Sequence, residues 1–523
     1  MKNDELETQA RDGANLSIWQ SSFSDQLHTD KHDAEKVYDV LIIGGGITGI
    51  TAALRLQKQG KNCVLAEAKN IGFGTTGGTT AHLNTFLDTT YPEIDTDFGK
   101  DASRLIASAA KNMIELVKSN IEELKIDADF EYKDGYLFSQ NEEETAELQP
   151  IFESSQAAGV EVAHVPDNGI LIPFEEVLCF KNQAQFHPLK YIYGLAKEFK
   201  RLGGIILENT FIRETKLHGE IHHATSDQLT LKAKNIFYAT HIPPGINILS
   251  LRNAPYRSYV IAVSLKSTPY PDGLAYDMKE PYHYFRTHKI NGQPYLIIGG
   301  ADHKTAHEDP LKAFEELENY ARTHFDIIAV AYRWSSQYYV PVDGLPYMGQ
   351  LPGGDKNIYI ATGFSGNGMI LGSLSGVVIS DIILGKENAY EKLLSPARLK
   401  PISGFTEFVK ENADVAYRFV ADRFGAEIIK STNELEEDEG KIVDFGGEKL
   451  AIYKDDKGKV TALKPVCTHA GCIVGWNPTE KTWDCPCHGG RFSTCGQVLT
   501  GPPQKNLESI SLAGLTANKK END

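Results

Sequence analysis

A glycine-rich turn between an apolar strand and a helix is the feature that most constrains the fold of this chain. Residues 37–67 read VYDVLIIGGGITGITAALRLQKQGKNCVLAE, in which Gly44, Gly46 and Gly49 have the spacing G-x-G-x-x-G. In such a unit the first glycine permits a tight turn, the second lets the backbone approach a pyrophosphate, and the third lets the helix pack closely on the strand. The pattern predicts a Rossmann-like α/β unit that binds a dinucleotide.

An acidic residue at the end of the second predicted strand strengthens this interpretation. Glu67 follows Gly49 by 18 residues, a distance at which a carboxylate accepts hydrogen bonds from a ribose hydroxyl. An acid at this position also disfavours the 2′-phosphate of NADP. Glycine-rich turns alone can serve packing, but the strand, the helix and the acid together favour a dinucleotide.

Further segments favour FAD over NAD. They are residues 71–84 (IGFGTTGGTTAHLN), 187–204, 341–349 and 357–376 (NIYIATGFSGNGMILGSLSG). Together with the first turn they resemble the superfamily of D-amino-acid oxidase, glycine oxidase and sarcosine oxidase. In that superfamily the first of these segments wraps the FAD pyrophosphate, and the last lies beside the flavin ring. The residues that the resemblance assigns to FAD in these segments are Thr75, Thr76, Gly363, Gly366 and Gly368.

The resemblance covers about residues 36–395 and implies a domain organisation. The expected fold is a Rossmann-like α/β FAD-binding domain into which an antiparallel α+β substrate domain is inserted. The FAD-binding pieces would be about residues 37–85, 186–250 and 335–395, and the substrate-binding pieces about residues 86–185 and 251–334. Residues 1–36 would form an N-terminal extension.

The attachment of the flavin can also be inferred from the resemblance. Some relatives, such as the dimethylglycine dehydrogenases, attach FAD covalently through a histidine in the second segment. Gly78 stands at the matching position of this chain, although His82 is near. We therefore expect non-covalent FAD.

Four residues near the C-terminal end form the pattern C-x-H…C-x-x-H, namely Cys467, His469, Cys485 and His488. Two thiolates suit one iron of a [2Fe–2S] cluster and two neutral imidazoles suit the other, which is the Rieske arrangement. A zinc site can use the same ligand types, but zinc fingers pair Cys with Cys and His with His along the chain. Here each segment supplies one of each, so we expect a Rieske cluster.

The residues around this pattern resemble the Rieske proteins of cytochrome bc complexes. The resemblance implies a disulfide between Cys472 and Cys487 that braces the cluster loops, although disulfides are unusual in the cytoplasm. Residues 496–503 (GQVLTGPP) match the proline loop of that family. Cys495 is left over and is expected to be a thiol without a role.

Two positions depart from that family. A serine and a tyrosine usually follow the last ligand, and their hydroxyls donate hydrogen bonds to sulfur and raise the reduction potential. Gly490 and Phe492 stand there in this chain, and neither has a hydroxyl. Fewer hydrogen bonds to sulfur stabilise the reduced cluster less, so we expect a potential below that of the respiratory proteins.

The region between the two predicted cofactor sites is expected to be a linker. Residues 405–424 carry apolar side chains at helical spacing, which predicts an amphipathic helix within a linker of residues 396–430. Short segments in which apolar and polar residues alternate follow, as is typical of strands. They predict a small all-β Rieske domain at residues 431–515.

Aromatic and cationic residues cluster between residues 254 and 300, where a substrate site is expected. They are Tyr256, Arg257, Tyr259, Tyr276, Tyr282, His283, Tyr284 and Arg286, and Arg333, Tyr338 and Tyr339 follow. In the superfamily, an arginine or lysine and one or two tyrosines hold the substrate carboxylate, a task suited to the arginine fork. Packing is the alternative for each single residue. We select Arg286 and Tyr284 as candidate substrate-binding residues.

The charge and the hydrophobicity of the chain limit the kinds of partner that it is expected to bind. The net charge of −17 disfavours nucleic acid and anionic lipid, which would be repelled. We see no apolar run long enough to span a membrane and no secretory signal, so the expected location is the cytoplasm. The expected partners are a small amine or amino-acid substrate and an external electron acceptor, which could be a protein.

The sequence thus predicts an FAD-dependent dehydrogenase. Hydride transfer from an amine or amino acid to flavin would be followed by single-electron transfer through the Rieske cluster to the acceptor. Two alternatives remain open at this point. One is a reductase in which electrons flow from a donor protein through the cluster to the flavin. The other is a redox sensor or electron carrier whose cluster state controls the binding of a partner.

Overall fold

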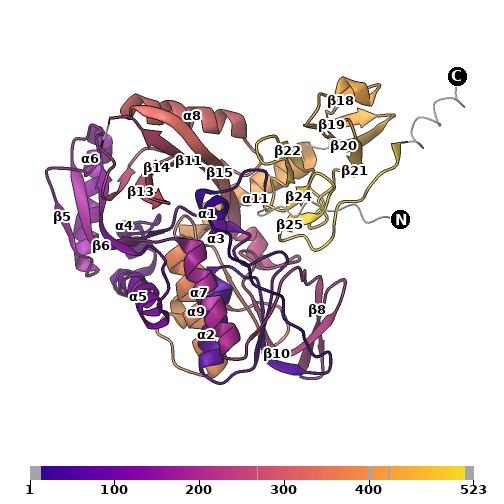
Figure 1. Cartoon of the computed structure of the whole chain (residues 1–523), viewed down its shortest axis with the longest axis horizontal. Coiled ribbons are helices and arrows are strands. Elements are labelled where there is room, and N and C mark those ends of the chain that lie inside the picture. The colour runs from indigo at the N-terminus through magenta and orange to yellow at the C-terminus, as the bar shows by residue number, and fades with distance from the viewer. Residues whose placement is uncertain (1–12, 268, 399–402, 422–424, 513–523) are drawn as a thin grey trace, which may run out of the picture.

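The protein has three regions, each built around β-sheet, as Figure 1 shows. The computed structural model describes residues 13–267, 269–398, 403–421 and 425–512. An α/β layer at one end carries the glycine-rich turns, a large sheet covers it, and two small sheets form a separate C-terminal domain. None of the helices in these ranges is both long and apolar enough to cross a membrane.

The first sheet is the predicted parallel α/β unit. Its central strands lie in the order β17-β10-β1-β2-β7 and are all parallel, and β16 adds an antiparallel edge. Strands buried on both faces need continuous apolar runs, and β1 has that composition. The bounds are β1 Val37–Ile43, β2 Cys63–Ala66, β7 Ile205–Leu207, β8 Glu214–His218, β9 Ile221–Thr225, β10 Thr230–Tyr238, β16 Tyr347–Gln350 and β17 Ile358–Thr362.

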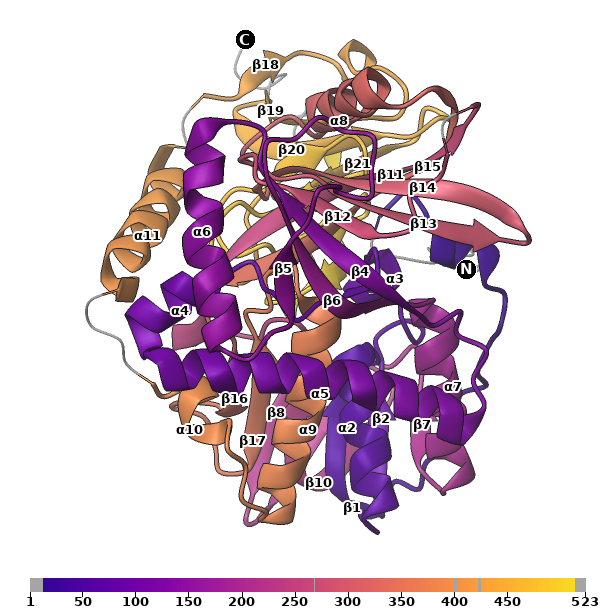
Figure 2. The ribbon, with the colours of Figure 1, turned by 90° about the vertical axis from the view of Figure 1, so that its left-hand side faces the viewer.

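Helices cover this sheet. Helix α2 packs on α9 and α7, and Figure 2 shows α5 running across that helical layer. The bounds are α2 Ile47–Lys58, α3 Thr75–Gly78, α4 Tyr91–Phe98, α5 Lys100–Leu124, α6 Glu142–Ala157, α7 Pro188–Arg201, α8 Pro310–His324, α9 Gly368–Leu384 and α10 Glu391–Leu394.

The second sheet has nine strands and draws on two distant parts of the chain. Its order is β15-β11-β14-β13-β12-β4-β6-β3, and β5 pairs with β6. All pairs are antiparallel except β12 with β4. The bounds are β3 His82–Leu83, β4 Glu131–Phe138, β5 Val162–His164, β6 Val177–Gln185, β11 Asn253–Leu265, β12 Leu274–Asp277, β13 Tyr284–Ile290, β14 Gln293–Lys304 and β15 Ile327–Pro341.

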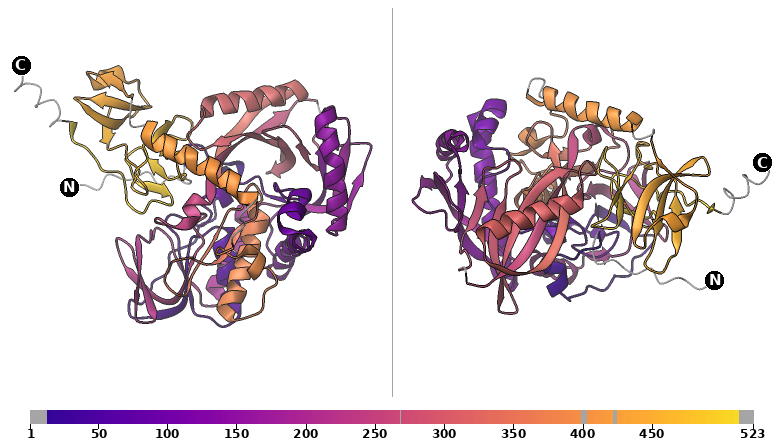
Figure 3. Two further views of the ribbon diagram at one scale, coloured as in Figure 1. Left: turned by 180° about the vertical axis from the view of Figure 1, so that it is seen from behind. Right: turned by 90° about the horizontal axis from the view of Figure 1, so that it is seen from above.

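The C-terminal domain consists of two four-stranded sheets, one of which presents the metal-binding pattern. Figure 3 shows α11 (Ser403–Ala421) running along the outside of the molecule toward this domain. The strands are β18 Glu427–Ile429, β19 Glu439–Phe445, β20 Glu448–Lys454, β21 Val460–Leu463, β22 Gly475–Asn477, β23 Thr482–Asp484, β24 Arg491–Ser493 and β25 Val498–Thr500.

Some boundaries differ from those expected. Strand β3 and the last residues of β15, which the sequence places in FAD-binding pieces, form part of the second sheet. Strand β18 pairs with β19 and so belongs to the C-terminal domain rather than to the linker. Residues 1–12 of the extension, 422–424 of the expected linker helix and 513–515 of the expected Rieske domain lie outside the described residues.

The N-terminal extension contributes to the core of the flavoprotein part. Helix α1 (Ile18–Ser22) begins with a capping box at Ser17. The Trp19 side chain is fully buried, and its indole N–H donates a hydrogen bond of 2.6 Å to the Thr79 carbonyl. Its ring also packs edge-on against His187 and His288. The extension is therefore an integral part of the fold.

We predict that Trp19→Ala destabilises the flavoprotein part. Truncating a fully buried tryptophan costs about 3–5 kcal/mol because packing is lost and a cavity is left. Urea unfolding followed by circular dichroism should show a lower midpoint. The matched control is Leu16→Ala on the same segment, whose side chain is 38% exposed and whose truncation should have a small effect. Equal midpoints for Trp19→Ala and the unchanged protein would contradict the role given to α1.

Candidate functional site

A cavity of about 720 Å³ runs between the first two sheets. Its walls include Gly44, Gly46 and Glu67 from the first glycine-rich unit and Thr75 and Thr76 from α3. The first two predicted FAD-binding segments therefore meet in one cavity.

The glycine-rich turn has the geometry that a pyrophosphate needs. Gly44 has a φ of +113°, which L side chains rarely adopt. A Cβ atom on Gly49 would lie 2.0 Å from the Gly44 carbonyl oxygen, so only glycine lets α2 pack so closely on the turn. Gly46, the N-cap of α2, supplies no side-chain cap, which leaves amide groups at a helix N-terminus where an anion is stabilised.

The Glu67 carboxylate is held in place at the wall. Its two oxygens accept hydrogen bonds from the backbone N–H groups of Gly45, at 2.6 Å, and Lys69, at 2.9 Å. Burial raises the pKa of this carboxyl. The backbone N–H bonds orient the carboxylate where a ribose would be bound, which fits a dinucleotide.

The C-terminal glycine turn meets the same cavity at the start of α9. Gly366 and Gly368 line the cavity, whereas Gly363 does not. A Cβ atom on Gly363 would lie 2.7 Å from the Asn253 Oδ1 atom and 3.1 Å from Pro341. Gly363 therefore permits close packing of the turn on the second sheet. Gly366 and Gly368, which line the cavity, are the glycines that could contact a cofactor.

Two positions of the second segment bear on whether the flavin is attached covalently. A Cβ atom on Gly78 would lie 2.1 Å from the Ser336 hydroxyl oxygen, so a larger residue there would require this hydroxyl to move. His82 also lines the cavity, but its Nδ1 atom is 2.7 Å from the Tyr276 hydroxyl. Burial and the charge of Arg286 hold the pKa of His82 well below its usual value, so this imidazole is neutral. The geometry fits non-covalent flavin.

The two candidate substrate-binding residues have different positions. Tyr284 lines the cavity. Arg286 lies on the same strand but outside the cavity wall, fully buried, and its guanidinium donates hydrogen bonds to the Thr80 and Ala81 carbonyls. Trp19 covers it, with 5.2 Å between the guanidinium carbon and the ring centroid. The described residues thus separate Arg286 from the cavity, and the role that we predicted for it is not supported by this geometry.

The other aromatic and cationic candidates also divide into two groups. The residues that line the cavity are Tyr256, Tyr276, Tyr282, Tyr284 and Tyr338. The residues that lie elsewhere are Arg257, Tyr259, His283, Arg286, Arg333 and Tyr339. None of the described arginines lines the cavity.

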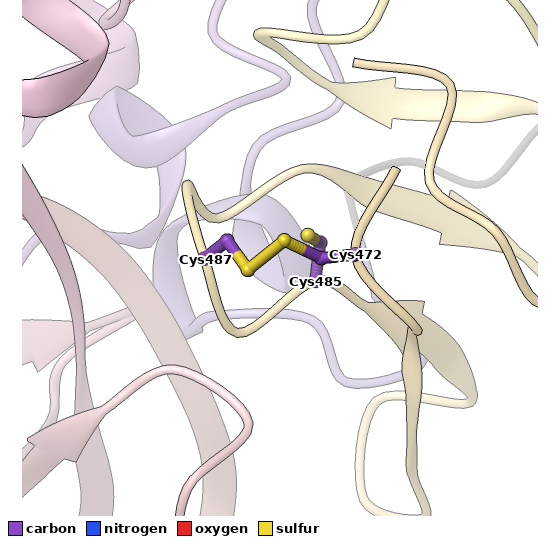
Figure 4. Close-up of side chains that lie close together, drawn as sticks. All are labelled: Cys472, Cys485 and Cys487. Carbon is purple, nitrogen blue, oxygen red and sulfur yellow. A yellow bond between two sulfur atoms is a disulfide. The ribbon is translucent and has the colours of Figure 1, made fainter. Parts of the chain in front are cut away.

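The C-terminal domain brings the predicted cluster ligands together in a buried position. Cys467, Cys485 and His488 are each less than 5% exposed, and the rings of His469 and His488 lie 4.8 Å apart. Cys472 and Cys487 form a disulfide, which confirms the predicted pair, and Figure 4 shows Cys485 beside it.

The donor atoms fit an iron–sulfur cluster. The two ring nitrogens of His488 and the Nδ1 atom of His469 are buried without a hydrogen-bond partner among the described residues. Burial lowers the pKa of both imidazoles, to about 3 in His488, so both are neutral as metal ligation requires. Unsatisfied buried nitrogens are costly, and ligation to iron would remove that cost. Cys495 is exposed and lies within reach of the Ser493 hydroxyl instead.

The two unusual residues beside the ligands have a packing role. A Cβ atom on Gly490 would lie 2.8 Å from Pro503 in the proline loop and 3.6 Å from the Cys467 sulfur. Phe492 is fully buried in the core of the domain. Glycine at 490 therefore lets the proline loop lie close to the ligand.

The proline loop reaches the flavoprotein cavity. Leu499, Thr500, Gly501 and Pro503 are part of the cavity wall. The His469 Nε2 atom lies 3.2 Å from the carbonyl oxygen of Gly245, which follows β10 of the first sheet. A metal-bound histidine commonly donates its second N–H to a carbonyl, so this contact fixes the tautomer and joins the two domains.

A second set of contacts joins the cluster loop to β15. The Gln337 amide donates a hydrogen bond of 2.9 Å to the Gly489 carbonyl, and the Tyr339 hydroxyl donates one of 3.3 Å to the His488 carbonyl. Tyr339 packs edge-on against His241, with 4.9 Å between ring centroids, and His241 lines the cavity. Only a few side chains therefore separate the cavity from the cluster ligands.

Sequence reasoning missed three groups of site residues. The proline loop was assigned to the cluster alone, although it also borders the cavity. The acidic residues that line the cavity, among them Asp88 and Asp302, were not singled out because they are scattered along the chain. The third group is Trp19 and its neighbours, which shield Arg286, and the available signal was the presence of Leu16, Ile18 and Trp19 within a polar N-terminus.

Comparisons with protein families agree with this division. The family described as FAD dependent oxidoreductase (DAO) matches residues 39–382, and the family described as Rieske [2Fe-2S] domain matches residues 426–511. A Bacillus subtilis protein described as a Rieske 2Fe-2S iron-sulfur protein, YhfW, is 34% identical over 91% of this chain and 93% of its own length.

More distant similarities cover the flavoprotein part or the cluster part. The gamma-glutamylputrescine oxidoreductase of Escherichia coli is 24% identical over 74% of this chain and 93% of its own length. The crystal structure of glycine oxidase from Geobacillus kaustophilus has the same fold, with a TM-score of 0.58 and 19% identity over 69% of this chain and 99% of that one. The cytochrome b6-f complex iron-sulfur subunit of Chlorobaculum thiosulfatiphilum is 35% identical over 14% of this chain and 45% of its own length.

We predict that Cys485→Ser loses the cluster and that Cys495→Ser keeps it. The two residues lie in the same region, but only Cys485 is placed among the ligands, so the second variant is the matched control. Iron and acid-labile sulfide should be present in equal amounts in the control and absent from Cys485→Ser, while FAD content stays unchanged in both. Zinc in place of iron and sulfide in the unchanged protein would refute the assignment.

We also predict that Phe492→Tyr raises the reduction potential of the cluster. The variant restores a hydroxyl that can donate a hydrogen bond to sulfur, and such bonds stabilise the reduced state. Protein-film voltammetry should give a lower potential for the unchanged protein than for respiratory Rieske proteins, and an upward shift for the variant. Phe492→Leu, which adds no hydroxyl, is the control. A potential in the unchanged protein as high as in the respiratory proteins would contradict this account.

Proposed function

Because the chain belongs to the family of FAD-dependent oxidoreductases and carries a C-terminal Rieske domain, we propose that it is an amine or amino-acid dehydrogenase. It oxidises its substrate at the carbon beside the nitrogen and passes the electrons singly to an external acceptor. The protein is an oxidoreductase whose cofactors are FAD and a [2Fe–2S] cluster. FAD supplies two-electron chemistry and the cluster supplies one-electron transfer when each is bound.

One observation carries the proposal. The cavity that would hold FAD and the loops that would hold the cluster share a wall, made by the proline loop and the residues after β10. Gly245 accepts a hydrogen bond from His469, and its own N–H donates one of 3.1 Å to the Pro502 carbonyl. A domain bound so closely to the cavity is suited to internal electron transfer.

The residues of the chain have distinct tasks in this proposal. Gly44, Gly46 and the N-terminus of α2 bind the pyrophosphate, and Glu67 binds a ribose. Cys467 and Cys485 would hold one iron, and His469 and His488 the other. The tyrosines on the second sheet surround the substrate, and the proline loop closes the cavity against water on the cluster side.

The names of two similar proteins support an amine or amino acid as the class of substrate. Gamma-glutamylputrescine oxidoreductase and glycine oxidase both act on compounds with an amine nitrogen, as their names state. This chain is similar to the first in sequence and to the second in fold over most of its flavoprotein part. We therefore assign it a small amine or amino-acid substrate.

Anaerobic titration with substrate candidates tests the proposal. Secondary amines, N-methyl amino acids, primary amines and D-amino acids are added while flavin absorbance and the EPR signal of the reduced cluster are followed together. We expect one class to bleach the flavin and the cluster signal to appear afterwards. In Cys485→Ser the flavin should bleach with no cluster signal to follow.

Other outcomes separate the alternatives. A bleached flavin beside an oxidised cluster in the unchanged protein would mean that the Rieske domain is not the internal acceptor. If no compound reduces either centre, although dithionite reduces both, the dehydrogenase proposal fails. The reverse flow from a donor protein, or a sensor role, would then take its place.

A further inference from the structure

The part of the cavity outside the nucleotide-binding unit is lined by more acidic than basic side chains. Among the described residues that line the cavity, six acids lie outside the nucleotide-binding unit, and they are Asp88, Glu93, Glu147, Asp277, Glu280 and Asp302. Lys279 is the one lysine among the lining residues, and its ammonium lies 5.1 Å from the centre of the Tyr320 ring. In the described part of the chain no arginine lines the cavity, and Arg286 donates hydrogen bonds to backbone carbonyls behind its wall. Such a site repels a carboxylate and attracts a cation.

Asp302 is the acid with the clearest geometry for binding a ligand. Its carboxylate accepts hydrogen bonds from the Ser258 hydroxyl and, at 2.8 Å, from the Tyr338 hydroxyl. A carboxylate has about four acceptor sites, so capacity remains for a further donor. Burial, together with the charge of Asp88, raises the pKa of Asp302 to about 7. A cation beside it would stabilise the ionised form.

Asp277 differs from Asp302 in that its carboxylate is bound by groups of the protein itself. Its carboxylate accepts hydrogen bonds from the backbone N–H of His283, at 2.6 Å, from the ring of His283, at 2.8 Å, and from the Tyr320 hydroxyl, at 2.8 Å. Its hydrogen-bonding capacity is largely used within the protein. Asp277 therefore holds β12 and α8 together, whereas Asp302 is available to a ligand.

Aromatic rings and a free acceptor complete the site. Tyr284 is 2.9 Å from Ser258 through its hydroxyl, and its ring lies 5.8 Å from that of His82. His82 is hydrogen-bonded to Tyr276, which accepts a hydrogen bond of 2.7 Å from the Asn84 amide. The Asn84 side chain is buried and lines the cavity, and its Oδ1 atom has no hydrogen-bond partner among the described residues. An ammonium group can donate to this oxygen and face the aromatic rings.

We propose that the substrate is an aliphatic diamine or polyamine, one nitrogen of which is bound as an ammonium group by Asp302 beside the tyrosines that line the cavity. This inference rests on the proposed dehydrogenase function and specifies its substrate class. The argument for a second nitrogen is chemical. The nitrogen beside the oxidised carbon must be unprotonated to supply its lone pair, so a carboxylate that anchors a cation serves another nitrogen of the same molecule.

The overall reaction balances with the cofactor that the family supplies. The group R–CH2–NH2 loses a hydride from carbon to FAD and a proton from nitrogen to solvent, which leaves a C=N bond. Water then adds to this bond and releases ammonia, so that an aldehyde remains. The anchored ammonium group takes no part in the bond changes, which makes Asp302 a substrate-binding residue.

Three probes of similar length test the proposal by anaerobic flavin bleaching. They are 1,4-diaminobutane, 1-aminobutane, which lacks the second nitrogen, and 4-aminobutanoate, in which a carboxylate replaces it. We expect half-bleaching at a concentration about tenfold lower for the diamine than for the monoamine, the size of one charge-assisted contact. The amino acid should be the poorest of the three. A lower concentration for 4-aminobutanoate, or equal values for the diamine and the monoamine, would overturn the inference.

Asp302→Asn connects this preference to the residue. We expect the variant to lose the roughly tenfold advantage of the diamine over 1-aminobutane. Asp272→Asn is the matched control, since that carboxylate is 97% exposed and pairs with Lys133 on the surface. A retained preference in Asp302→Asn with a full complement of FAD would refute the role of Asp302. The comparison of probes on the unchanged protein decides the substrate class even if this variant does not fold.

The outcomes also distinguish this inference from the proposed function. If glycine or an N-methyl amino acid bleaches the flavin and the three probes do not, the dehydrogenase function stands and the diamine inference fails. If no amine or amino acid bleaches the flavin and dithionite does, both fail.

Discussion

The alternation of side chains along β15 is the constraint on which both centres depend. Successive residues of a strand point to opposite faces. Ser336 and Tyr338 line the cavity, whereas Ser335 and Tyr339 contact the C-terminal domain. A shift of one residue in the pairing of β15 with β11 would exchange the two sets. The long antiparallel register from Asn253 to Leu265 therefore places Tyr338 at the cavity and Tyr339 at the cluster loop.

Buried polar contacts across this strand make the docking specific. Glu480 of the C-terminal domain is fully buried and accepts hydrogen bonds from the backbone N–H and the hydroxyl of Ser335. The hydroxyl of Ser335 also accepts a hydrogen bond of 2.7 Å from Arg257, which is itself buried. Charged groups withdrawn from water are costly unless they are well bonded. A C-terminal domain in another orientation would leave Glu480 without these donors, which favours the observed arrangement. On the outer side, Asp414 of α11 pairs with Lys304 and His307.

Local spacing was enough to predict the parts of the site that the chain builds within a short segment. Gly44 and Gly49 pack closely against each other within one turn of the chain. Cys472 and Cys487 are brought together by two neighbouring loops, for which the family resemblance was sufficient. Arg286 shows where such reasoning ends. Its role depends on Trp19 and on the backbone at Thr80, which are far away in sequence, and no pattern around residue 286 indicates that they cover it.

The same limit applies to the charge of the cavity. Asp88 follows β3 and Asp302 lies on β14, and they meet only because two distant pieces of chain form one sheet. The sequence therefore pointed to arginine as the substrate anchor, by analogy with amino-acid oxidases, whereas the folded cavity presents carboxylates.

In the proposed dehydrogenase, the placement of the two centres would also separate the routes of substrate and electrons. The acids and tyrosines that would bind an amine lie on the cavity side of the second sheet, and the cluster ligands lie beyond β15 and the proline loop. Electrons that leave through His469 and His488 would cross this wall, so that a bound substrate does not obstruct their path. An electron acceptor could then approach the C-terminal domain while product still occupies the cavity. A fused one-electron centre is useful under that geometry, because oxidation of the flavin need not wait for the cavity to empty.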